Sequence, residues 1–229
     1  MARGSRPPGR ARLRLLASGG IAGPAAFTAA WIAASLRQPA RSFNRIQLSG
    51  LAAPDAKDPW IMIAGFVVLG AGMSALGAAL KQALGGPRRA GKGPGLVQVA
   101  GLATIAAGLF RRDQALLGPG WAEESWHHRL HDTVSVVVYA ASLAAPLLLA
   151  RRFRGDPRWA ATRRPVLACA LASAALLCLF ASGAVRSWNG AVQRAMASVS
   201  LGTPLVLAWK LLTEEAVPET GDLSRADTA

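Results

Sequence analysis

The chain has three histidines, and all of them lie in one short polar segment: His127, His128 and His131, directly followed by Asp132. On a helix, His127 and His131 share a face because they are four residues apart. Two imidazoles at this spacing can bind zinc, and Asp132 or Asp113 can supply an oxygen ligand. A zinc-protease helix carries a glutamate between its histidines, and this segment has none. The spacing leaves two hypotheses open, a metal-dependent hydrolytic site and a polar cluster without a metal.

Three further charged residues, Asp113, Arg45 and Arg194, are expected at the same end of the protein as the histidines. In one hypothesis they form a structural cap, in which Asp113 or Asp132 pairs with Arg45 or Arg194. In the other, the arginines recognise the phosphate or carboxylate of a lipid head group or a small polar ligand. Arg194 lies about one turn inside the last apolar run, where a charge is costly without a partner. It either snorkels to the outer surface or forms an ion pair with Asp132.

The elements that position these residues are six long apolar runs. Because a helix of about 20 residues crosses a hydrocarbon core of about 30 Å, each run is a candidate transmembrane helix. The first has 22 residues, too many for the apolar region of a secretory signal. We predict an all-α polytopic bundle between a basic tail (1–14) and a disordered tail (213–229). The predicted spans are 15–36, 60–84, 95–110, 133–150, 165–185 and 192–212.

The distribution of basic residues predicts the orientation. Seventeen of the 26 lysines and arginines fall in the basic tail, in segments 81–92 and 151–164, or toward the C-terminus, where the two are Lys210 and Arg225. Since basic loops stay in the cytoplasm, both termini are predicted inside and the histidine cluster outside. The tryptophans are expected at the membrane interfaces, with Trp159 and Trp209 on the inner side. The protein is therefore expected in the plasma membrane, with membrane lipids as its partners.

Composition supports this class of protein. Apolar residues make up 52% of the chain and charged residues 17%, below the roughly 25% usual for a soluble domain. The net charge of +14 is explained by the cytoplasmic loops, and no polar segment is long enough for a nucleic-acid-binding domain. Small residues such as Gly70 and Gly72 predict close helix packing, and Gln98 predicts an interhelical hydrogen bond. No cofactor is expected.

Several segments resemble a known family. They are 42–70, 108–113, 118–120, 125–132 and 188–190, with Gln193 and Arg194. Over residues 18–212 the chain is similar to the domain-of-unknown-function 998 proteins, six-helix membrane proteins common in actinobacteria and other prokaryotes. Family members tend to have proline where this chain has Arg111, and glutamate where it has Gln193. The resemblance implies the fold and topology without an activity, and it directs attention to His131, Asp132, Asp113 and Arg194.

Together these observations favour a non-enzymatic function. We expect a membrane bundle that binds a lipid head group or small polar ligand at its outer face. The residues expected to take part are His127, His131, Asp132, Asp113, Arg45 and Arg194. The first alternative is a membrane-embedded hydrolase that holds a metal with His127, His131 and Asp132. A small-solute transporter is the third hypothesis, although mid-membrane charges and broken helices are lacking.

Overall fold

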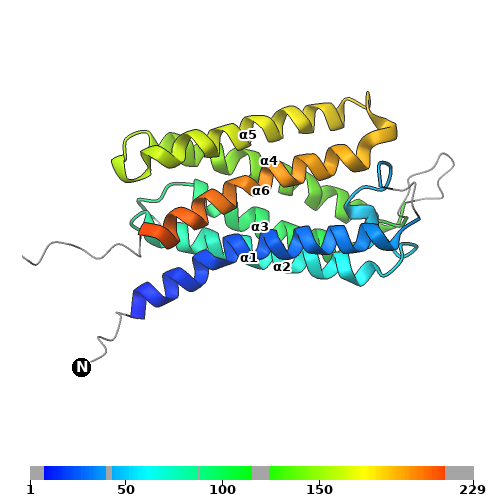
Figure 1. The fold of residues 1–229 in the computed structure, drawn as a ribbon, viewed down its shortest axis with the longest axis horizontal. Coiled ribbons are helices and arrows are strands. Elements are labelled where there is room, and N and C mark those ends of the chain that lie inside the picture. The colour runs from blue at the N-terminus through cyan, green and yellow to red at the C-terminus, as the bar shows by residue number, and fades with distance from the viewer. Residues whose placement is uncertain (1–7, 40–42, 87, 115–123, 215–229) are drawn as a thin grey trace, which may run out of the picture.

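A computed structural model describes residues 8–39, 43–86, 88–114 and 124–214, and their regular elements are all helical. Consecutive helices pack side by side, and α6 returns to pack on α1, so that the helices form a ring (Figure 1). The all-α fold predicted from the sequence is therefore confirmed. The α-helices are α1 (Pro8–Arg37), α2 (Pro59–Ala83), α3 (Gly93–Leu109), α4 (Trp126–Phe153), α5 (Ala160–Ala181) and α6 (Asn189–Glu214). Short 3₁₀ turns lie at η1 (Ser49–Ala52), η2 (Pro157–Trp159) and η3 (Arg186–Trp188).

Five of these helices are long and apolar enough to cross a membrane, which makes this a membrane-embedded protein. The helix outside that group is α3, which is apolar but has 17 residues. At 1.5 Å per residue it measures about 26 Å, slightly less than a typical hydrocarbon core. Its crossing of the membrane remains a prediction, as does the cytoplasmic position of the termini.

Both described chain ends lie at the same end of the bundle (Figure 1). We call this the tail end; it also holds the α2–α3 and α4–α5 connections. Within the predicted basic tail, α1 already begins at Pro8, because proline suits a first helical turn and arginine is a good helix former. Residues 1–7, and all but 213 and 214 of the predicted disordered tail, lie outside the described residues.

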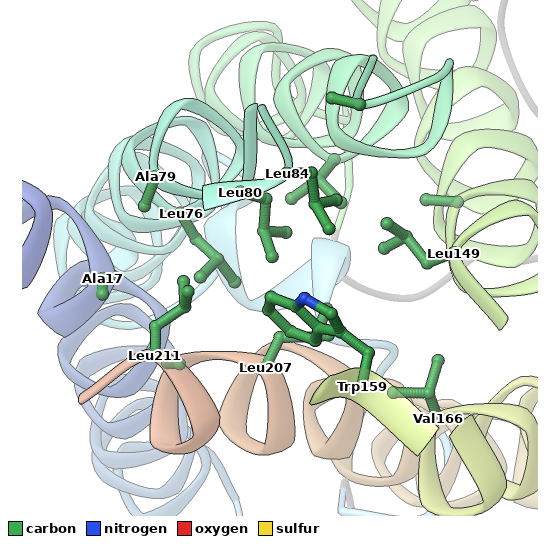
Figure 2. Packing of buried hydrophobic residues seen from close by; sticks show 14 of the residues in the cluster. Ala17, Leu76, Ala79, Leu80, Leu84, Leu149, Trp159, Val166, Leu207 and Leu211 are labelled. Carbon is green, nitrogen blue, oxygen red and sulfur yellow. The ribbon is translucent and has the colours of Figure 1, made fainter. Parts of the chain in front are cut away.

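The tail end has a dense apolar core (Figure 2). Trp159 is fully buried there and stacks on Phe153, with the ring centroids 4.7 Å apart. Leu80, Leu149 and Leu207 bring α2, α4 and α6 into the same cluster. The short turn η2 folds the indole back between the helices, so that Trp159 packs inside the protein. Its position at the inner membrane interface stays a prediction.

Small residues allow the close packing of the first three helices. A side chain on Gly72 would start 2.3 Å from the carbonyl oxygen of Gly19 on α1, and one on Gly70 would start 2.4 Å from that of Gly101 on α3. The close packing predicted at Gly70 and Gly72 is thus confirmed. The interhelical hydrogen bond of Gln98 is confirmed as well, since its amide binds the carbonyl of Ser74 and the ammonium of Lys81.

Candidate functional site

The opposite end of the bundle, here called the polar end, holds the α1–α2, α3–α4 and α5–α6 connections (Figure 1). Residues 43–48 of the first connection lie on the beginning of α6. Gly190 makes this possible, because a β-carbon there would lie 2.4 Å from the carbonyl oxygen of Ile46. Its own N–H donates to the carbonyl of Asn44 over 2.7 Å. Backbone carbonyls of the connection are thereby brought to the first turn of α6.

Arg194 uses these carbonyls and is only 3% exposed. Its Nη1 donates to the carbonyl oxygens of Phe43 (2.9 Å), Ile46 (2.7 Å) and Gly190 (2.9 Å). Its Nη2 donates to the hydroxyl of Ser35 on α1 over 2.9 Å, and the guanidinium lies 4.4 Å from the ring centroid of Phe43. Neither snorkelling nor the predicted ion pair with Asp132 describes this arrangement, since Asp132 lies against His128. Arg194 ties α1, the connection and α6 together.

Its neighbour Gln193 extends this network across the bundle. The side-chain carbonyl accepts from the N–H of Leu48 over 2.6 Å. The amide nitrogen donates to the hydroxyl oxygen of Tyr139 on α4 over 2.9 Å. Gln193 is buried, so both ends of its amide are satisfied inside the protein.

A second network fixes the start of α4. Ser125 is the N-cap, and its hydroxyl accepts from the N–H of His128 over 3.2 Å. Asp113 accepts from the N–H of Ser125 over 2.9 Å and also from its hydroxyl. These two hydrogen bonds, together with the nearby imidazole of His128, lower the pKa of Asp113. Because this cap is available, α4 begins at Trp126, ahead of the predicted span 133–150.

Arg112 lies buried beside this network. Its Nη1 donates to the side-chain carbonyl of Gln47 over 2.6 Å. Burial lowers the pKa of Arg112, and the carboxylate of Asp132 opposes that shift. The guanidinium therefore joins the α3–α4 connection to the α1–α2 connection.

His131 is 3% exposed and bridges α4 to the end of α3. Its Nδ1 lies 2.9 Å from the carbonyl oxygen of Ala107 and 2.8 Å from that of Phe110. Carbonyl oxygens only accept, so Nδ1 carries the proton and Nε2 has the lone pair in the neutral ring. The hydroxyl of Ser135 lies 3.3 Å from Nε2.

A partly open cavity of about 150 Å³ extends from this point toward the middle of the bundle. It is lined by α1, α2, α3, α4, α6 and residues 48–49, and most of the lining is apolar, with side chains such as Phe66, Leu69 and Met196. The polar side chains of the lining are His131, Ser135, Tyr139 and Gln193, together with Ser49, Thr104, Ser142, Ser200 and Thr203.

The structure separates the residues that the sequence had grouped as one site. His131 faces the cavity, whereas His127 is exposed, with its ring centroid 3.6 Å from that of Trp126. Asp132 is also exposed and lies 3.6 Å from Nε2 of His128. Arg45 lies exposed on the connection. Among the described residues, no group of three histidine, cysteine, aspartate or glutamate side chains is placed to hold a metal ion.

Sequence reasoning missed Ser135 and Tyr139. The signal for them was their spacing, because residues 131, 135 and 139 follow one another at four-residue steps and so share a face of α4. His128 was seen only as a member of the cluster, and its burial depends on the N-cap at Ser125.

The family model described as "Protein of unknown function (DUF998)" matches residues 21–210. This chain belongs to that family. The resemblance found in the sequence is confirmed, and the matched segment includes every residue that lines the cavity. The DUF998 description assigns no activity. No curated protein and no solved structure matches the chain.

Proposed function

We propose that this protein binds a neutral single-chain amphiphile, such as a monoacylglycerol, taken from the membrane. The polar part of the ligand lies against Ser135, Tyr139 and Gln193, and the adjoining part of its chain enters the cavity. The observation that carries this proposal is the lining, which is mostly apolar and offers uncharged hydroxyl and amide groups to the polar part of a ligand.

The volume of the cavity is sufficient for part of a single acyl chain. A closed apolar cavity of roughly 150 Å³ holds a molecule the size of benzene, so a whole lipid does not fit. The rest of the ligand remains outside, in the bilayer. Apart from His131, the polar side chains of the lining are uncharged, which favours an ester or hydroxyl over a phosphate or carboxylate.

A side opening toward lipid is consistent with the packing of α5. Its buried residues are Thr162, Val166, Ala170 and Ser173, all before the last two turns of the helix. On α4, the next buried residue after His131 is Ala141. The two helices diverge from their connection toward the polar end (Figure 1). We infer that the ligand enters between them.

By the positive-inside rule, the basic residues of the tail end support our proposal that the polar end lies on the outer side of the plasma membrane. In that orientation the ligand comes from the outer leaflet. The proposal does not use the lipid-head-group role expected for Arg194, because the terminal nitrogens of Arg194 bind backbone carbonyls and Ser35. The same role for Arg45 stays a prediction.

A cavity-filling substitution tests the proposal. Ala197 lines the cavity on α6, whereas Ala195 is exposed on the same helix. Ala197→Phe is expected to reduce photocrosslinking by a diazirine analogue of 1-oleoylglycerol at least about tenfold, a loss of about 1.4 kcal/mol in binding. Ala195→Phe is the matched control and should crosslink like the wild type. Equal crosslinking of all three proteins would exclude the cavity as the binding site.

A further inference from the structure

We propose that Ser135 and His131 act as a nucleophile and general base that hydrolyse an ester bond of the amphiphile in the cavity. The inference rests on the proposed binding function and adds that the bound amphiphile is hydrolysed. It starts from the distance of 3.3 Å between the Ser135 hydroxyl and Nε2 of His131, at a point where both side chains line the cavity.

His131 has the arrangement that a general base requires. The carbonyls of Ala107 and Phe110 hold the proton on Nδ1 and fix the plane of the ring. The lone pair of Nε2 therefore points to Ser135, as in a serine–histidine pair whose base is oriented by a third group. In this protein two backbone carbonyls take the place of the usual carboxylate. The orienting groups are rigid because they belong to the last turn of α3 and its C-cap.

Tyr139 supplies the donor that such a reaction needs. Its oxygen already accepts from the amide of Gln193 over 2.9 Å, so its own proton is left to donate to another acceptor. Tyr139 lies one helical turn beyond Ser135 and lines the same cavity. A carbonyl oxygen that gains negative charge during attack by Ser135 can accept this proton in a hydrogen bond, in surroundings of low polarity that strengthen it.

The reaction has two steps. In the first, Oγ of Ser135 bonds to the ester carbonyl carbon while His131 Nε2 takes the hydroxyl proton; the bond to the alcohol oxygen then breaks, and His131 returns the proton to that oxygen. In the second, a water molecule gives a proton to His131 and attacks the acyl–Ser135 carbon, and the proton returns to Ser135 as the fatty acid leaves. The sum is ester plus water giving acid plus alcohol.

The competing explanation is that Ser135 only satisfies the buried imidazole through a hydrogen bond within one helix. A purely structural serine does not react with a fluorophosphonate, whereas a serine activated by a base does. Labelling of the full-length protein in lipid nanodiscs with an alkyl fluorophosphonate, followed by peptide mass spectrometry, is therefore decisive. The label is expected on Ser135 in the wild-type protein, a result that needs no variant to fold.

Activity is followed in parallel as hydrolysis of 1-oleoylglycerol. Ser135→Ala is expected to lower the rate at least about 100-fold, on the scale of losing a base-activated nucleophile. The matched control is Thr133→Ala, which removes an exposed hydroxyl from the same helix. Thr133→Ala should retain both labelling and hydrolysis.

Two failures are distinguishable. If Ser135 is unlabelled and no hydrolysis occurs, while 1-oleoylglycerol still crosslinks and Ala197→Phe still blocks it, the catalytic inference is overturned and the binding function stands. If crosslinking is also insensitive to Ala197→Phe, both are overturned. A label on a serine other than Ser135 overturns the assignment of the nucleophile.

Discussion

The two ends of the bundle are stabilised in different ways. At the tail end, Trp159, Phe153 and leucines from several helices fill the interior with apolar contacts. At the polar end, a second apolar cluster around Leu51 and Met62 is joined by buried arginine, glutamine and histidine side chains, which donate to backbone carbonyls or bind other side chains, and a cavity remains between the helices. Hydrogen bonds hold their partners at fixed distances, whereas apolar side chains pack until space is filled. The hydrogen-bonding side chains of the candidate site therefore come from the end where such bonds supplement apolar packing.

The largest loss of stability is expected from a substitution at the tail end. Trp159→Ala is expected to lower the free energy of unfolding by about 3–5 kcal/mol, because it leaves a large void in a packed core. Trp209→Ala is the control, since this tryptophan is 66% exposed on the same half of the protein. Denaturation in mixed micelles measures both. Similar losses for the two variants would contradict the buried position of Trp159.

At the polar end the main effect is expected from hydrogen bonds. Arg194→Ala leaves the carbonyls of Phe43 and Ile46 without their donor and should cost about 2–3 kcal/mol. Arg45→Ala, at an exposed position on the same connection, should change stability by less than about 0.5 kcal/mol. Thermal unfolding of both variants in detergent checks the contrast.

A double variant of Arg194 and Asp132 tests whether these two residues form an ion pair at the polar end. Arg194 binds α1 and the α1–α2 connection, whereas Asp132 faces His128 on α4. The losses in Arg194→Ala and Asp132→Ala are therefore expected to add within about 0.5 kcal/mol in the double variant. A double variant that costs clearly less than the sum would indicate direct pairing.

The smallest effect is expected at the cap of α4. Asp113→Asn should cost about 1 kcal/mol at neutral pH, because it weakens the hydrogen bonds to Ser125. The pKa of Asp113 is lowered in the folded protein, so its carboxylate stabilises the fold above the ordinary value of about 3.9. This contribution is lost as the pH falls through the lowered pKa, and the two proteins should then converge.

Asp58→Asn is the control for this titration. Asp58 pairs with Arg37, whose side chain is 62% exposed, and an exposed pair contributes little. Unfolding followed by circular dichroism between pH 3 and 7 measures both variants. If the Asp113→Asn protein were as stable as the wild type at pH 7, the hydrogen bonds of Asp113 to Ser125 would not contribute to the stability of the polar end.

Much of the fold was predictable because it depends on local composition. Long apolar runs form helices in a membrane whatever their neighbours, since each backbone polar group must be paired within its own segment. The start of α4 was not predictable from hydropathy, because polar residues 126–132 become helical only through the cap of Ser125 and Asp113. The burial of Trp159 likewise depends on the turn η2.

The sequence by itself determined the helical class, the family and the end of the protein where the polar residues gather. It also contained the spacing of His131, Ser135 and Tyr139. Only the tertiary structure decided that His131 faces inward while His127 lies outside, and that Arg194 binds backbone carbonyls. The physical reason is that a helix face acquires its role from what packs against it. The end of α3 and residues 43–48, distant in the chain, supply the carbonyls that select these side chains.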